Sequence, residues 1–307
     1  MQQQTTFQPL TLITPTAAMS ASVHGGRAKC LQRLIRLDMP VPKAVALSFD
    51  AVNRIAQGNI PDMSAVLAPF GDNPLVSVRP SSQDPDWGGP SAILNIGMND
   101  ARLATMIPQL GEWAATAVYL RFVQSYAIHV ARLDPDEFYL PDIPDAAGLK
   151  VMLDSYEAET DEPFPQDPSV QLAEVLRSMA RAWDGTSARL LRQAKGAPAD
   201  AGLGLVVQAM ALGVGQGECG SGVIQYVDST TGQPQIKGRY LGQSQGREAL
   251  GDTDSALYLT NDPRGPSLEE RSPEAFAQLQ FFGALCRRKL REEMQIEFTI
   301  ESGTSYS

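Results

Sequence analysis

The sequence has 307 residues, 43% of them hydrophobic, and a formal net charge of −10 at pH 7. A chain of this length and composition can bury a sizeable core and form one large domain or two to three smaller ones. It lacks the basic surface that binding to a phosphate backbone or an acidic membrane requires, so neither nucleic acid nor a membrane is expected as a partner.

The three cysteines are scattered, and none lies in a Cys-x-x-Cys motif. An odd number of cysteines without such spacing is typical of a reducing compartment and gives no zinc motif. The first ten residues do not combine a basic segment with an apolar run, and no stretch reaches the roughly 18 apolar residues of a membrane span. These features favour a cytoplasmic protein.

Residues 1–21 are polar and predict an irregular leader or an edge strand. Gly25 and Gly26 precede a helix whose apolar side chains recur at helical spacing at Leu31, Leu34 and Ile35. Free backbone amides at such a helix start, together with the first-turn side chains Arg27 and Lys29, can bind an anion. The alternative is a solvated helix start with exposed basic side chains.

Residues 73–82 predict a buried strand that ends in a loop. Arg79 lies at the end of this strand, where a guanidinium suits an ion pair at a sheet edge or a contact with a bound anion.

Residues 101–194 predict a mostly helical region, because apolar side chains recur three and four residues apart in two long segments. Between these segments, residues 134–168 hold 11 acids and one lysine, and we expect a solvated excursion. A metal site among these carboxylates is the alternative, but no ligand spacing is repeated. His129 suits a satisfied core or surface position better than a catalytic one.

Residues 204–251 predict two β-hairpins. Apolar strands are expected over 206–211, 223–227 and 236–241. The glycine-rich run 213–222 suits a loop that lies close to a ligand or to another backbone. Farther on, Ser272-Pro273-Glu274 predicts the start of a helix through about Arg291, followed by a strand over 294–301.

Several segments occur in the order and spacing of one family: residues 24–31, 37–48, 76–79, 93–100, 208–210, 220–223, 229–232, 245–246 and 294–301. The chain resembles the ATP-grasp nucleotide-binding domain of the pyruvate, phosphate dikinase and phosphoenolpyruvate synthase family. The resemblance implies an α+β fold, namely an ATP-grasp fold with a helical insertion. It divides the chain into an N-terminal subdomain (1–100), the insertion (101–200), and a hairpin and C-terminal subdomain (201–307).

The resemblance also implies ATP as a ligand and gives each site residue a role. Arg27 takes the place of the family's phosphate-contacting lysine, and Arg79 that of the arginine that holds the transferring phosphate; these two are the predicted catalytic residues. The predicted nucleotide contacts are Arg27, Lys29, Arg79, Gln208, Met210, Gln245, Arg247 and Glu248. Considered apart from the resemblance, the residues around Gln208 and Met210 predict a core strand with one polar position.

The family binds Mg²⁺ through carboxylates that correspond to Glu297 and Gln295, and here a glutamine replaces one of them. A basic residue of the family is missing after Gly222-Val223. The family's Q-G-E becomes Gln245-Gly246-Arg247, with Glu248 one position late, so a cation stands where an acid is expected.

Because these departures cluster around the metal, the sequence favours an ATP-binding module that is catalytically weakened or inactive and acts as a regulatory or assembly partner. The alternative is an active ATP-dependent phosphotransferase that phosphorylates a histidine on a separate protein. Neither His24 nor His129 lies in the family's T-x-G-x-x-(S/C)-H motif, so the chain is not expected to run the pyruvate reaction alone.

Overall fold

The computed structural model describes residues 8–228, 230–252, 254–290, 295–302 and 304–306. The chain forms two compact units. Unit 1 holds the described parts of Met1–Gln32, Lys43–Ile107 and Ala115–Met210, and unit 2 those of Arg33–Pro42, Pro108–Ala114 and Ala211–Ser307. Helices and antiparallel sheets occur in both, which confirms the α+β prediction. The division at residues 100 and 200 stays a prediction.

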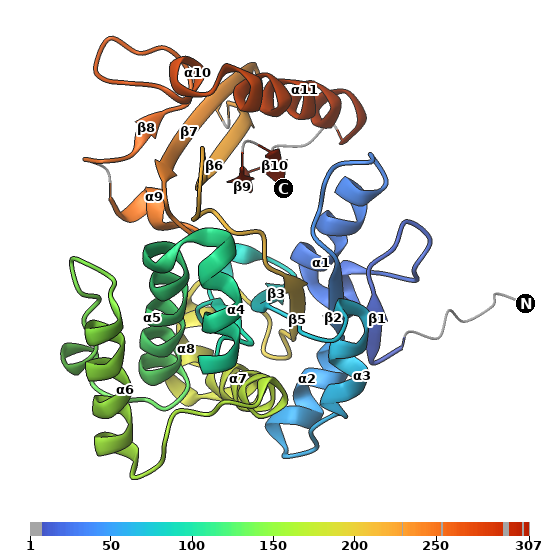
Figure 1. The fold of residues 1–307 in the computed structure, drawn as a ribbon. Coiled ribbons are helices and arrows are strands. Elements are labelled where there is room, and N and C mark those ends of the chain that lie inside the picture. Colours follow the sequence, from blue (N-terminus) through green and yellow to red (C-terminus); the bar gives the residue numbers. More distant parts are fainter. Residues whose placement is uncertain (1–7, 229, 253, 291–294, 303, 307) are drawn as a thin grey trace, which may run out of the picture. The chain divides into compact units, whose positions relative to one another are not determined.

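Unit 1 is built on a five-stranded antiparallel sheet of order β1-β2-β5-β3-β4 (Figure 1). Its strands are β1 (Leu10–Leu12), β2 (Ala44–Leu47), β3 (Val76–Ser82), β4 (Ile93–Ile96) and β5 (Leu203–Ala209). Every residue of β2 is buried, as are the first six of β5, because both faces of these central strands are covered. The polar leader thus contributes an edge strand, β1.

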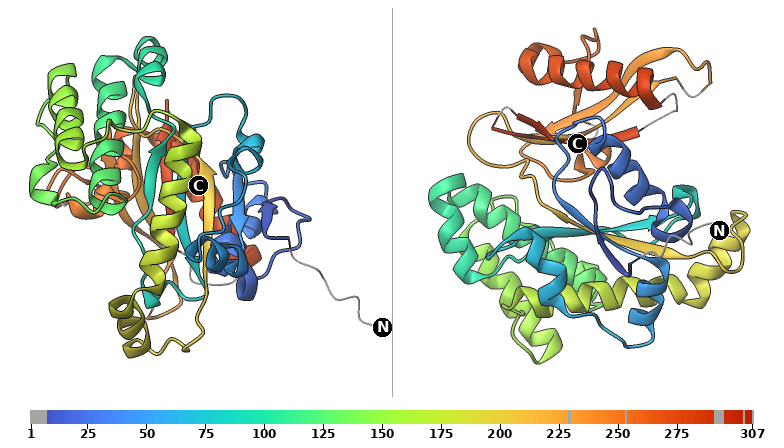
Figure 2. Two further views of the ribbon diagram at one scale, coloured as in Figure 1. Left: turned by 90° about the horizontal axis from the view of Figure 1, so that it is seen from below. Right: turned by 90° about the vertical axis from the view of Figure 1, so that its right-hand side faces the viewer.

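The helices that belong to unit 1 in whole or in part are α1 (Ala21–Ile35), α2 (Phe49–Ala56), α3 (Met63–Leu67), α4 (Asp100–Leu110), α5 (Glu112–His129), α6 (Ala146–Thr160), α7 (Pro168–Asp184) and α8 (Thr186–Ala194). Three short 3₁₀ turns lie at Ala68–Phe70, Pro85–Trp87 and Pro135–Glu137. Helices α2 and α7 pack against each other and against β5 (Figure 2). No described helix combines the length and the apolar character needed to cross a bilayer.

The helical region predicted over 101–194 is confirmed, but the expectation of a plain solvated excursion over 134–168 is wrong. This segment contains α6 and carries two aromatic side chains, Tyr156 and Phe164, into a buried cluster with Tyr126. The 11 acids of the segment are all exposed. The charged side chains of the segment therefore face solvent. Its few apolar residues, which its overall composition does not reveal, pack the segment against α5.

The segment 93–100, one of the specific family matches, is fixed by hydrogen bonds within unit 1. The Gln171 side chain accepts from the Gly97 amide at 2.8 Å and donates to the Met98 carbonyl at 2.9 Å. The Tyr119 hydroxyl donates to Asp100 at 3.0 Å. These buried partners give the motif a structural role: it joins β4 to α4 and holds both to α5 and α7.

Unit 2 contains a second antiparallel sheet, of order β10-β9-β6-β7-β8. Its elements are β6 (Gly220–Val227), β7 (Pro234–Gly242), α9 (Glu248–Gly251), β8 (Leu257–Tyr258), α10 (Leu268–Arg271), α11 (Pro273–Leu290), β9 (Gln295–Glu301) and β10 (Thr304–Tyr306). The predicted hairpin of 223–227 with 236–241 is confirmed as β6–β7.

The prediction of two hairpins over 204–251 is wrong in its first part. Strand β5 ends at Ala209 and pairs with β2 and β3 in the sheet of unit 1, whereas β6 pairs with β7 and β9. Periodicity identifies both strands but cannot tell which sheet each one joins. The helix predicted from residue 272 is confirmed as α11, and the strand over 294–301 as β9; Met294 lies outside the described residues.

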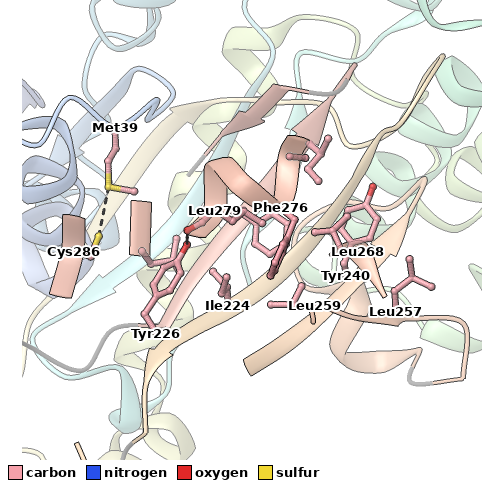
Figure 3. Packing of buried hydrophobic residues seen from close by; sticks show 14 of the residues in the cluster. Met39, Ile224, Tyr226, Tyr240, Leu257, Leu259, Leu268, Phe276, Leu279 and Cys286 are labelled. Atoms are coloured by element: carbon pink, nitrogen blue, oxygen red, sulfur yellow. Dashed lines mark hydrogen bonds between the residues drawn. The ribbon is translucent and has the colours of Figure 1, made fainter. Parts of the chain in front are cut away.

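The core of unit 2 lies between α11 and one face of its sheet (Figure 3). The hydroxyl of the buried Tyr226 donates to the Leu279 carbonyl at 2.7 Å, and Tyr240 stacks on Phe298 with ring centroids 6.2 Å apart. Residues alternate between the faces of a strand, so Glu297, next to Phe298 in β9, lies on the face opposite this core.

Candidate functional site

The part of α1 around its kink at Gly25 is held against the end of β3 by contacts with Ser81. Gly25 has φ 85° and ψ 168°, which breaks the helix into two parts. A Cβ atom at Gly25 would overlap the Ser81 carbonyl. The Ser81 hydroxyl donates to the His24 carbonyl at 2.7 Å and accepts from the Ala28 amide at 3.1 Å. The glycine pair thus lets the helix pack directly on the strand that carries Arg79.

These contacts bring Arg27 to the neighbourhood of Arg79. The Arg27 Nε donates to the Pro80 carbonyl at 3.0 Å, one residue from Arg79. Arg79 lies in the middle of β3 and not at its end as predicted, because the strand continues to Ser82. It is half-buried and pairs with Val206 across the sheet, while Ser77 pairs with Gln208. Directly paired residues of antiparallel strands share a face, so Arg79 and Gln208 lie on one face of the sheet. Three predicted site residues therefore gather in unit 1.

The predicted contacts Lys29 and Met210 have other local roles. The Lys29 ammonium donates to the Met19 carbonyl at 3.1 Å and to Gln32 at 3.0 Å, which ties the helix to the preceding loop. Met210 follows β5, and its amide donates to the Leu75 carbonyl at 3.0 Å. Neither arrangement tests a nucleotide contact, so both assignments stay predictions.

The two histidines of the chain predict a pH dependence of stability. Burial lowers the pKa of His24 and that of His129, and Arg132 lowers the latter further. Below their unfolded pKa of about 6.5, the unfolded chain binds more protons than the folded one, so stability is lost as the pH falls. We expect the free energy of unfolding, measured with urea, to fall between pH 7 and pH 5 by up to about 1.4 kcal/mol per pH unit for each histidine.

The matching variant is His24→Gln, which removes one titrating group. Its stability should vary less with pH over the same window, whatever its absolute value. An unchanged pH slope would contradict the assignment to His24. Aspartates with lowered pKa values, such as Asp262 at about 2, titrate below this window and do not interfere.

The glycine-rich loop of unit 2 is held by side chains that the sequence analysis did not single out. Gln243 binds both backbone groups of Gly215, at 3.0 and 3.1 Å. Glu218 accepts from the Tyr240 hydroxyl at 2.7 Å and pairs with Arg271 at 3.0 Å. Burial and the Glu218 hydrogen bond raise the pKa of Tyr240. A glutamine beside a glycine turn is too common a sequence pattern to predict the hydrogen bonds between Gln243 and Gly215.

The remaining predicted residues also gather, in unit 2. The Arg247 Nε lies 3.7 Å from Glu297 Oε1. Gln245 is buried, and its carbonyl accepts from the Glu248 amide at 3.3 Å at the start of α9. Gln295 is exposed at the beginning of β9. The cation that replaces the family's acid therefore pairs with the carboxylate predicted to bind metal.

The donor set for Mg²⁺ is poor. Mg²⁺ requires near-octahedral oxygen ligands and is held in most sites by one or two carboxylates with phosphate and water. Of the two predicted ligands, Gln295 is neutral and Glu297 is in an ion pair with Arg247. Within the part of the chain that the structure describes, no three His, Cys, Asp or Glu side chains are grouped to hold a metal ion. The weakened Mg²⁺ site therefore stays a prediction.

No protein-family model matches the chain. Pyruvate, phosphate dikinase of Rhizobium meliloti (strain 1021) is 28% identical over 322 aligned positions, which cover 91% of this chain and 36% of that protein. The same-named proteins of Clostridium symbiosum (26%) and Flaveria trinervia (chloroplastic, 24%) cover 94% and 91% of this chain. The chain spans about a third of the length of these curated relatives. It is therefore similar, along nine tenths of its length, to pyruvate, phosphate dikinases, which confirms the family resemblance of its motifs.

Proposed function

We propose that this chain is an ATP-binding module of the pyruvate, phosphate dikinase type whose phosphoryl-transfer chemistry is weakened or lost, and that it acts as a regulatory or assembly partner. The observation that carries the proposal is the difference between the predicted site residues of unit 1 and those of unit 2. In unit 1, Arg79 and Gln208 share a face of the sheet and Arg27 is hydrogen-bonded to the Pro80 carbonyl next to Arg79, whereas in unit 2 the predicted metal carboxylate Glu297 is paired with Arg247.

The gathering in unit 1 supports nucleotide binding. Two guanidinium groups near the same strand, β3, offer charge-assisted hydrogen bonds to phosphate oxygens. The Arg27 side chain is held by the Pro80 carbonyl, so part of the cost of ordering it is met before a ligand arrives. Gln208 on the same face offers donors and acceptors for a base or a ribose.

The pairing in unit 2 supports weakened catalysis. Phosphoryl transfer is accelerated chiefly by positioning and by neutralising the charge that develops on the phosphoryl oxygens. A glutamine in place of one carboxylate and an arginine in place of an acid leave a poor site for the divalent cation. Binding of the base and ribose depends less on that cation than the transfer step does.

One observation favours a second function: both predicted catalytic cations are kept, and Arg27 is hydrogen-bonded to the Pro80 carbonyl next to Arg79. On that ground the alternative is an ATP-dependent kinase of the dikinase type that phosphorylates a histidine on a separate protein, with Mg²⁺ supplied through Glu297. The next experiment separates the two functions.

Thermal unfolding with ATP tests the proposal. At an ATP concentration about a hundredfold above Kd, ligand binding should raise the free energy of unfolding by about 2.7 kcal/mol. Inorganic triphosphate at the same concentration controls for non-specific anion binding and should stabilise less. We expect no loss of the γ-phosphate when a phosphohistidine-domain protein is added with Mg²⁺. Histidine phosphorylation would favour the kinase, and no stabilisation by ATP would overturn nucleotide binding.

A further inference from the structure

The open face of β9 carries the acids that could take part in cation binding in unit 2. Side chains alternate along a strand, so Gln295, Glu297, Thr299 and Glu301 share the face opposite the core. Only two of these four are carboxylates, and both are engaged. Glu297 pairs with Arg247, and Glu301 accepts from the Leu212 amide at 3.1 Å.

Arg247 is directed to this face by its local backbone. It follows Gly246, whose φ of 57° makes a tight turn, and the buried Gln245, and it immediately precedes α9. Helix α9 packs against β6 and β7, and β6 is the neighbour of β9, with Val223 paired to Glu297. The Arg247 side chain is 55% exposed and that of Glu297 22%, so the guanidinium keeps donors that an incoming anion can reach.

We propose that the guanidinium of Arg247 takes the place of the Mg²⁺ ion in this site, so that the chain binds the nucleotide triphosphate without a divalent metal. This inference rests on the proposed function. A divalent cation at Glu297 would be repelled by the guanidinium 3.7 Å from the same carboxylate. The guanidinium instead supplies a fixed positive charge and hydrogen-bond donors for phosphate oxygens.

Calorimetric titration of the full chain with ATP, in buffer with EDTA and in buffer with millimolar MgCl₂, tests the inference. We expect the Kd values in the two buffers to agree within about threefold, a difference below 1 kcal/mol. Restoring an acid with Arg247→Glu should make binding metal-dependent, with Mg²⁺ tightening the Kd by about tenfold or more.

Two further variants control for charge and folding. Arg288→Glu makes the same charge change at an exposed position of α11, on the opposite face of the sheet, and should bind ATP as the unaltered chain does. Arg247→Met removes the cation without adding an acid and should weaken ATP binding in the EDTA buffer, where no metal can replace the lost charge.

The outcomes distinguish this inference from the proposed function. If Mg²⁺ tightens ATP binding to the unaltered chain by about tenfold or more, the inference is overturned while nucleotide binding stands. The absence of ATP binding in both buffers overturns both. The comparison of the two buffers uses the unaltered chain, so it does not depend on any variant folding.

Discussion

Gly25→Ala should destabilise the protein by about 2 to 6 kcal/mol, the sum of the penalty for a positive-φ backbone that suits only glycine and of overpacking against a backbone group that cannot rotate away. Gly25 has φ 85°, and an added Cβ would overlap the Ser81 carbonyl. To make room, the helix around Gly25 would have to leave β3 and give up the hydrogen bonds that Ser81 makes with His24 and Ala28. Urea unfolding measures the loss as a lower midpoint.

Gly58→Ala is the matched control. Gly58 also has a positive φ, 96°, but no atom lies within 4 Å of the position of its added Cβ. This variant therefore carries the backbone penalty alone, about 1 kcal/mol. Equal losses for the two variants would show that backbone conformation, and not the contact with β3, dictates glycine at position 25.

The same contact with β3 illustrates what the sequence could predict. Two glycines before an apolar periodic segment predict a helix start; in the structure α1 already begins at Ala21, and Gly25 instead marks a break inside it. The residue that contacts this break, Ser81, lies more than fifty residues away, and no local pattern identifies it. Local chemistry therefore gives the element, while the long-range contact that makes it a site comes only from the packed sheet.

The prediction of which strands pair in one sheet was wrong for the same reason. Strands β5 and β6 are close in sequence and both strongly apolar, which predicts a hairpin, yet they belong to different sheets. The glycine-rich run between the two strands can take many backbone conformations, so the alternation of apolar residues in the strands does not determine the direction in which the chain continues. The prediction for the acidic segment 134–168 failed for a different reason: its mean composition does not reveal its few aromatic residues, of which Phe138, Tyr156 and Phe164 are buried.

The pairing of Arg247 with Glu297 could be predicted only in part. The sequence shows that a cation has replaced an acid after Gly246, and the family resemblance marks Glu297 as a metal ligand. That the two side chains face each other follows from the register of β6 with β9 and from the packing of α9, which are tertiary features. The replacement of an acid by Arg247 in the sequence thus accounts for the ion pair with Glu297 in the structure.

Replacing Arg79 with alanine should weaken ATP binding by about a hundredfold, or 2.7 kcal/mol, if the chain binds nucleotide as proposed. Arg79→Lys should retain part of the affinity, with a loss of about tenfold, because an ammonium keeps the charge but not the planar fork that binds two phosphate oxygens. Calorimetric titration with ATP measures both losses. Arg54→Ala, which removes an exposed arginine of α2 paired with Asp50, is the matched control and should bind ATP normally.

The order of the three affinities separates a ligand contact from a purely structural role for Arg79. If Arg79 only fastens the sheet edge by an ion pair, both Arg79 variants should lower the urea midpoint while leaving the ATP affinity of the folded fraction unchanged. A phosphate contact predicts the reverse, because Arg79 is only half-buried and shares a face of the sheet with Gln208. The midpoint without ATP should then change little, and the stabilisation that ATP adds should shrink in the order unaltered chain, lysine, alanine.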